Sequence, residues 1–196
     1  MELLLIRHGL PLRAESRDGS PVDPELSAEG RNQARRLAES LRGEPIEALY
    51  ASPMRRARET AQALAEVLSL EIQVDADLVE LDHLSGVYVP LEELKASDYP
   101  RWQALVQQGG LYADVDLPAF RRQVTRAIER IIAAHSGGRV AVACHGGVIN
   151  AWTSGLLGVE ELFVFEPVYT GVSRFLAARS GERSLLSLNE SGHLRD

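Results

Sequence analysis

Short apolar runs alternate with segments of helical period along this chain of 196 residues. Leu3 to Ile6 is the first run, and it is too short for a buried helix and typical of a central strand. Similar runs cover Ile46 to Ala51 and Val140 to Cys144, and a segment with helical spacing follows each. This alternation predicts an α/β fold with a largely parallel sheet.

Two serines mark expected helix starts. Ser27 can cap a helix in which apolar residues recur at i, i+3, i+4 and i+7 from Ala34. The dipeptide Ser52-Pro53 predicts another helix start, with Ser as the cap and Pro at the first helical position. Further patterns predict helices near 120–136 and 146–157, and strands at 72–74, 172–178 and 185–188.

Residues 83–116 do not follow this alternation. They contain Pro90, Pro100 and Gly109-Gly110 among short amphipathic pieces, which predicts an irregular helical lobe or lid. The expected elements account for most of the chain and leave no linker. We therefore expect one domain over residues 1–196.

Charge and cysteine content restrict the partners and the cellular compartment that we expect for the protein. The chain has 21 Lys and Arg against 28 Asp and Glu, a net charge of −7, which argues against nucleic acid as a partner. Arg7 ends the first apolar run, so no segment there resembles a membrane span or a secretory signal. The lone Cys144 fits a reducing compartment and is expected in the core. These features predict a cytoplasmic protein without a membrane partner, and they leave a homodimer open.

Histidines and arginines follow the three most clearly predicted strands, at the point where each strand ends. Arg7-His8-Gly9 follows the first, a segment leading to Arg56 follows the second, and His145-Gly146-Gly147 follows the third. In an open parallel sheet, ligands bind outside the carboxyl ends of the strands. The sequence therefore predicts that these side chains gather in one crevice.

The charge of this crevice indicates an anionic ligand. Arg56 falls in the first turn of its helix, where the helix dipole already favours an anion. A guanidinium matches the oxygens of a phosphoryl group, and Gly9 and Gly146 would let a ligand approach the backbone. We therefore expect a small phosphorylated substrate.

The sequence contains no motif typical of a metal site or a phosphate-binding P-loop, so we expect no cofactor and no metal. A neutral imidazole could then attack phosphorus and carry the group covalently. The leaving alkoxide needs a proton, which Glu80 is placed to donate, with Asp82 as the alternative. Arg7 and Arg56 should lower the pKa of His8 and keep Glu80 ionised until substrate binds, which predicts an activity optimum on the acid side of neutral.

Five ordered motifs resemble those of the histidine phosphatases, the phosphoglycerate mutase-like superfamily. They are Leu5-Ile6-Arg7-His8-Gly9, the helix motif 26–34, the arginine motif 52–61, the segment 78–82 and the second-histidine motif 142–149. The resemblance covers residues 3 to about 150. It implies a three-layer α/β/α sandwich with a mostly parallel central sheet.

The resemblance also implies roles for particular residues. His8 would be the nucleophile, Arg7, Arg56 and His145 would hold the phosphoryl oxygens, and Glu80 would be the acid and then the base. Leu10, Pro11 and Ala14 depart from the family pattern in the loop after His8, and Arg13 is our candidate substitute for the missing polar contacts.

These residues predict a phosphatase that hydrolyses a small phosphorylated metabolite through a phosphohistidine on His8. Mutases of the family tend to be longer, which favours hydrolysis here. Two alternatives stay open from the sequence: a mutase-type phosphoryl transfer, and a phosphoester-binding protein with little turnover.

Overall fold

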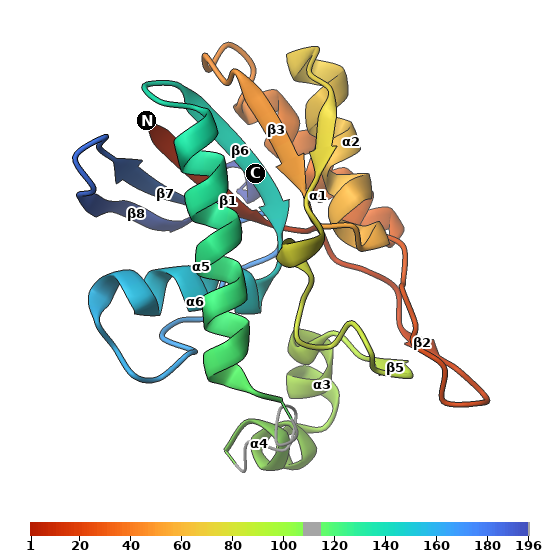
Figure 1. The fold of residues 1–196 in the computed structure, drawn as a ribbon. Helices are drawn as coiled ribbons and strands as arrows, with labels where there is room; N and C mark the ends of the chain where they lie inside the picture. Colours follow the sequence, from red (N-terminus) through yellow and green to blue (C-terminus); the bar gives the residue numbers. More distant parts are fainter. Residues whose placement is uncertain (108–114, 196) are drawn as a thin grey trace.

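The computed structural model describes residues 1–107 and 115–195, and its centre is a six-stranded sheet (Figure 1). The strand order is β4-β3-β6-β1-β7-β8. Neighbouring strands among β4, β3, β6 and β1 run parallel, whereas β7 is antiparallel to β1 and β8 to β7. The strand bounds are β1 Glu2–Arg7, β3 Ala48–Ala51, β4 Ile72–Val74, β6 Arg139–Cys144, β7 Val172–Ala177 and β8 Arg183–Glu190.

Helices cover both faces of this sheet because its central strands are buried on both sides. In β1, Leu3 and Leu5 pack in a core with α5 (Leu117–Ala134) and α6 (Gly146–Leu157), while Leu4 and Ile6 pack in a second core with α1 (Ala28–Ser40) and α2 (Arg55–Leu68). Figure 1 shows α5 and α6 in front of the sheet. Cys144 lies in the first core, as expected. The expected α/β/α sandwich with a mostly parallel sheet is confirmed.

The register of β1 and β6 brings the two histidine motifs together. Arg7 pairs with Cys144 in the parallel ladder, and His8 N–H donates to the carbonyl of Cys144 (3.0 Å). His8 and His145 are therefore the next residues of two neighbouring strands. The N–H of Ser52, after β3, donates to Ala143 (3.0 Å), so the third motif leaves the sheet at the same edge.

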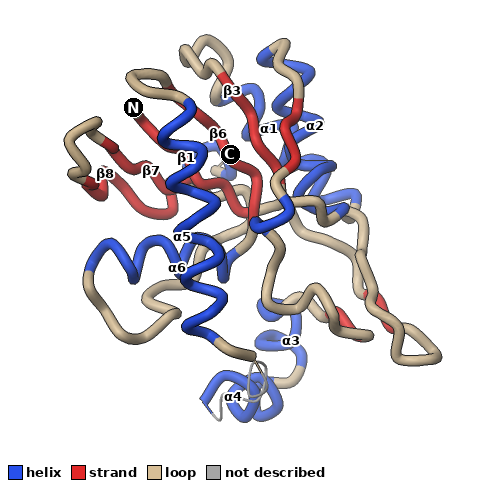
Figure 2. The backbone as a smooth tube through the Cα atoms, viewed as in Figure 1, coloured by secondary structure: helices blue, strands red, loops and turns tan. Residues whose placement is uncertain are grey.

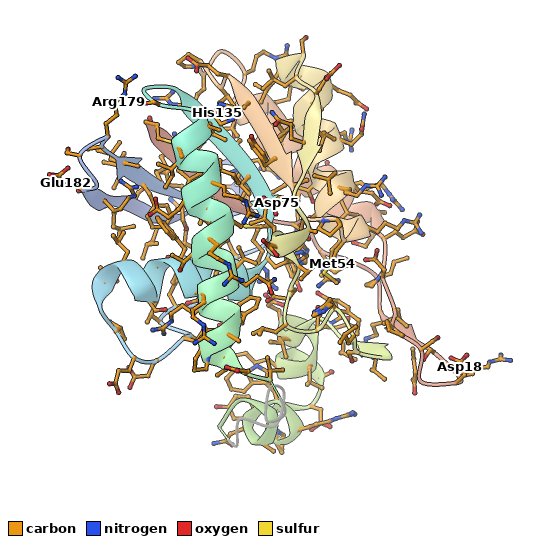
Figure 3. All side chains as sticks on the ribbon, in the orientation of Figure 1. Asp18, Met54, Asp75, His135, Arg179 and Glu182 are labelled. Carbon is orange, nitrogen blue, oxygen red and sulfur yellow. The ribbon has the colours of Figure 1, made fainter. Side chains whose placement is uncertain are left out.

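The segment that begins at residue 83 forms a lobe beside this edge of the sheet, as Figure 2 shows. We call residues 83–116 the lobe; it contains β5 (Val87–Tyr88), α3 (Leu91–Ser97) and α4 (Tyr99–Gln107), while 108–114 lie outside the described residues. Strand β5 pairs with β2 (Ala14–Glu15), which ties the lobe to the loop after β1. The tip of that loop, at Asp18, projects from the molecule (Figure 3). The assignment of 1–196 to one domain stays a prediction.

The predicted start of α2 is wrong by two residues. The helix begins at Arg55 with Met54 as its cap residue, and Ser52 and Pro53 lie outside it. The Ser52 hydroxyl is instead bonded to His145, and the carboxylate of Asp23 accepts the N–H of Arg55 (2.9 and 3.0 Å). A distant acidic residue therefore caps this helix. Ser27 does cap α1, since its side chain accepts the N–H of Gly30 (3.0 Å).

Two short 3₁₀ helices complete the described structure: Ala76–Leu78, just before Glu80, and Gly192–Leu194 near the C-terminus. Within residues 1–107 and 115–195, no helix combines the length and the apolar content that crossing a bilayer requires.

Candidate functional site

His8, Arg56 and His145 meet at the carboxyl edge of the sheet. The rings of His8 and His145 lie with their centroids 5.1 Å apart, and the Nε–H of Arg56 donates to Nε2 of His8 (3.2 Å). The side chains are almost completely buried, with relative exposures of 3% for His8, 1% for Arg56 and 0% for His145. Three segments that are distant in the sequence thus form one cationic cluster.

The hydrogen bonds of His8 fix its tautomer. Its Nδ1 lies 2.8 Å from the carbonyl oxygen of Gly9, which can only accept, so Nδ1 carries the proton. Nε2 receives the Arg56 N–H and is therefore unprotonated. Burial, together with Arg56 and Arg7, holds the pKa of His8 well below its ordinary value of 6.5. The ring is neutral at physiological pH and presents a nitrogen lone pair.

Each guanidinium of the cluster is held by one carboxylate and one aromatic ring. Arg7 donates to Glu92 of α3 and stacks over Tyr169, with its guanidinium carbon 3.9 Å from the ring centroid. Arg56 donates to Asp82 (2.8 Å), and its guanidinium carbon lies 4.7 Å from the ring centroid of Tyr88. These contacts fix the orientation of both planar groups.

Three nitrogens of the cluster have no hydrogen-bond partner among the described residues. They are Nε of Arg7, Nη1 of Arg56 and Nδ1 of His145, all inaccessible to solvent. A buried N–H that remains unpaired costs about 1–3 kcal/mol. A ligand with several acceptor oxygens would remove this cost.

The hydroxyl of Ser52 orients the ring of His145. Its Oγ lies 2.8 Å from Nε2 of His145 and also accepts the N–H of Met54 (3.3 Å). Because the hydroxyl already accepts one N–H, its own proton is available to Nε2, and we assign the ring proton to Nδ1. Burial, Arg56, His8 and Arg7 lower the pKa of His145, which keeps this ring neutral as well.

Glu80 approaches the cluster from the segment between β4 and the lobe. Its two oxygens accept the N–H groups of Leu81 (2.9 Å) and Gly147 (2.7 Å), and its own N–H donates to the sulfur of Met54 (3.4 Å). Met54 lies near the junction of the sheet and the lobe in Figure 3. A Cβ at Gly147 would come within 2.1 Å of Glu80 Oε1, so this carboxyl needs glycine there.

The protonation of Glu80 corrects one expectation from the sequence. Burial and the neighbouring Asp82 raise the pKa of Glu80 to about 7, and this outweighs the lowering by two backbone N–H groups and Arg56. The arginines therefore do not keep Glu80 fully ionised in the free protein. Desolvation dominates because Glu80 is only 8% exposed.

The glycines after the two histidines differ in their surroundings. A Cβ at Gly9 would lie 2.5 Å from the backbone oxygen of Gly30, so α1 packs directly against this turn. The nearest atom to a Cβ at Gly146 would be Nε of Arg7 at 3.9 Å, which leaves that side of the guanidinium uncrowded. Gly9 N–H donates to the Thr60 hydroxyl (3.0 Å), which ties the turn to α2.

Arg13 is the predicted site residue that the structure does not bring into the cluster. Its guanidinium is half-exposed and pairs with Glu93 of α3 (2.8 Å). Its role in substrate binding stays a prediction. His83 is exposed, and its ring bonds to the carbonyl of Glu80 (2.7 Å). Within the described ranges, no three His, Cys, Asp or Glu side chains gather as a metal site would.

Glu92 and Tyr169 are not predicted from the sequence, and Ser52 contacts His145 instead of capping a helix. The Tyr169 hydroxyl donates to Glu92 (2.7 Å), and its ring centroid lies 5.8 Å from that of His8. No local pattern marks either residue. The sequence does mark Ser52, since this residue opens the arginine motif at 52–61.

Curated relatives with comparable sequences include phosphatases. The chain is 31% identical to phosphoserine phosphatase 1 of Hydrogenobacter thermophilus over 170 residues, which cover 82% of this chain and 78% of that protein. It is 32% identical to glucosyl-3-phosphoglycerate phosphatase of Mycolicibacterium vanbaalenii over 80% of this chain and 74% of that protein. It is also 34% identical to phosphoglycerate mutase-like protein 4 of Arabidopsis thaliana, over 76% and 68% of the two chains.

Solved structures share the fold over nearly the whole chain. YhfR of Bacillus stearothermophilus superposes with a TM-score of 0.78 and 23% identity, covering 99% of both chains. A mutant phosphoserine phosphatase from Entamoeba histolytica in complex with phosphoserine gives a TM-score of 0.75 at 23% identity, also over 99% of both chains.

A family model matches residues 3–191 of the chain. The fold, the buried cationic cluster and this match define a phosphatase, a hydrolase of phosphoric monoesters. The chain belongs to the histidine phosphatase superfamily, branch 1.

Proposed function

We propose that this protein hydrolyses a small phosphorylated metabolite through a phosphohistidine on His8, using its own side chains rather than a metal ion. The observation that carries the proposal is the set of three unpaired buried nitrogens, on Arg7, Arg56 and His145, around an imidazole whose Nε2 is unprotonated. Hydrolysis of phosphoserine or of glucosyl-3-phosphoglycerate by relatives supports the same reaction class.

In the first step, Nε2 of His8 attacks phosphorus and the bond from phosphorus to the ester oxygen breaks. The Arg56 N–H that now faces Nε2 turns to a phosphoryl oxygen, and the guanidiniums and His145 stabilise the charge on the three equatorial oxygens. Glu80, protonated in a sizeable fraction of molecules near neutral pH, gives its proton to the leaving alkoxide. The alcohol then leaves.

In the second step, water attacks the phosphorus of phospho-His8. The Glu80 carboxylate takes a proton from this water, the bond from nitrogen to phosphorus breaks, and inorganic phosphate leaves. His8 returns to its neutral form with the proton on Nδ1, which the Gly9 carbonyl holds throughout. One carboxyl thus serves as acid and then as base.

A quench experiment tests the covalent intermediate. The protein is incubated with a phosphorus-labelled ester and quenched in alkali or in acid, because a phosphoramidate survives alkali and decomposes in acid. We expect label that resists alkali only and is missing from His8→Ala. Equal label in His8→Ala contradicts the proposal.

Analysis of the reaction products separates the two alternatives left open by the sequence. A mutase moves phosphate between two hydroxyls of one substrate, so isomerisation would outrun the release of inorganic phosphate. A binding protein with little turnover would bind esters and release almost no phosphate. Release of phosphate by the wild-type protein, absent in His8→Ala, supports hydrolysis over both.

A further inference from the structure

Each guanidinium of the cluster pairs with a carboxylate that is more exposed to solvent than the guanidinium itself. The Arg7 side chain is 11% exposed and its partner Glu92 is 35% exposed; the Arg56 side chain is 1% exposed and its partner Asp82 is 21% exposed. Glu92 also accepts the Tyr169 hydroxyl (2.7 Å). A substrate that places its phosphoryl group against His8 therefore extends its remaining part past acidic side chains.

The charge of Glu92 persists at neutral pH. Burial raises the pKa of this carboxyl, but Arg7 and the hydrogen bonds from Arg7 and Tyr169 lower it more, so that the pKa lies below its ordinary value. Burial raises the pKa of the Tyr169 phenol, which keeps it a neutral donor to Glu92. Glu92 is therefore a fixed negative charge beside the cluster.

Basic side chains near this position are themselves paired with acids. Arg13 pairs with Glu93 (2.8 Å), and Lys95, the only lysine in the sequence, lies 3.5 Å from Glu166. A phosphoryl group meets three unpaired nitrogens deep in the cluster, whereas an anion further out meets Glu92. The inner end of the site thus presents unpaired N–H donors, and its outer end presents a carboxylate.

We propose, building on the proposed function, that Glu92 is a specificity-determining residue that excludes phosphate esters with a second anionic group. The substrates are then phosphomonoesters whose alcohol part is uncharged or cationic. A carboxylate or second phosphate on the alcohol would face an ionised carboxylate at short range, and like charges there oppose binding. An ammonium group would meet a favourable partner instead.

Substrates of similar size and different charge test this selectivity. We expect kcat/KM for glycerol 3-phosphate and phosphoethanolamine to exceed that for 3-phosphoglycerate by at least about tenfold in the wild-type protein. Glu92→Gln keeps the shape and removes the charge, so it should reduce this ratio to within about threefold by improving the anionic substrate. Added salt should also reduce this ratio of kcat/KM values in the wild-type protein, because salt screens exposed charges.

Glu129→Gln is the matched control, because it removes the same charge from a different ion pair. Glu129 lies on α5 and pairs with Arg183 (2.6 Å). The variant should keep the wild-type ratio. A wild-type protein that prefers 3-phosphoglycerate, or a ratio unchanged by Glu92→Gln, overturns the role of Glu92.

Binding to His8→Ala separates this inference from the proposed function. Dissociation constants of the three esters, measured by calorimetry on His8→Ala with and without Glu92→Gln, report selectivity without turnover. Selective binding together with an absence of turnover in the wild-type protein contradicts hydrolysis and retains the role of Glu92. Turnover of all three esters at equal kcat/KM retains hydrolysis and contradicts the role of Glu92.

Discussion

The hydroxyl of Ser52 lies 2.8 Å from Nε2 of His145, and both side chains are fully buried. Ser52→Ala leaves this nitrogen without a partner, at a cost of about 1–3 kcal/mol in the free energy of unfolding. It also frees the ring to turn, so we expect kcat/KM to fall by at least about tenfold. Steady-state kinetics and urea denaturation measure the two effects.

Ser154→Ala is the control for this change. Ser154 is equally buried, but its hydroxyl makes only a long bond, 3.5 Å, to the Ala151 carbonyl within α6. Its activity should stay near the wild-type value. Equal loss of activity in both variants would show that Ser52 has no special relation to His145.

Arg55 and Arg56 are adjacent in the sequence, but only Arg56 lies in the histidine cluster. Arg56 is buried against His8, so Arg56→Ala should lower kcat/KM by about 10²- to 10³-fold, as removal of a donor to a developing charge does. Arg55 is exposed and pairs with Glu25 and Glu59, so Arg55→Ala should change the rate less than about twofold. Phosphate release by both variants checks this difference, and equal effects would contradict it.

The pH dependence of activity should follow Glu80 on the alkaline side. Its pKa is about 7, so the fraction able to donate a proton falls as pH rises through this value, and kcat/KM should fall with it. His8 stays neutral until well below pH 6.5, so it imposes a decline only in more acidic solution. Rates are corrected for the second ionisation of the substrate phosphate, at about pH 6. A profile that stays flat above about pH 7 contradicts the role of Glu80.

The stability of the protein should report the same carboxyl. The folded-state pKa of Glu80 is raised from 4.5 to about 7, so between these values the folded protein holds a proton that the unfolded chain has released. The contribution of Glu80 to the free energy of unfolding therefore falls as pH rises through this window. Glu80→Gln cannot ionise and escapes this loss. Its stability relative to wild type should improve by about 3 kcal/mol between about pH 4 and about pH 8, measured by urea denaturation.

Gly147→Ala should disable Glu80 without removing it. The added Cβ would lie 2.1 Å from Glu80 Oε1, which forces the carboxyl away from its position. We expect kcat to fall by at least about tenfold. Gly155→Ala, in the same helix, meets only the Arg121 side chain at 3.9 Å, and should keep its activity while gaining about 0.5–1 kcal/mol of stability. Unchanged activity in Gly147→Ala would contradict this account of Glu80.

The sequence predicts the sheet well because its central strands are buried on both faces. Leu3 to Ile6 and Val140 to Cys144 read as continuous apolar runs for this reason, and the residues just after them must lie at the sheet edge. His8, Arg56 and His145 could thus be placed together from their order alone.

Contacts between distant segments account for the parts that could not be predicted. Ser52 has the local signature of a helix cap, but a buried ring far along the chain takes its hydroxyl. Glu92 and Tyr169 reach Arg7 only because the lobe and the segment after α6 fold over the same edge of the sheet. The raised pKa of Glu80 likewise depends on burial, which the sequence near Glu80 does not reveal.

The parallel ladder between β1 and β6 sets the spacing of the two histidines, whereas Glu92, which we propose to face the rest of the substrate, belongs to α3. The lobe also supplies Glu92 and Tyr88, which hold the two guanidiniums. An insertion that replaced the lobe would therefore have to provide equivalent partners for Arg7 and Arg56 while it changed the metabolite that reaches the histidines.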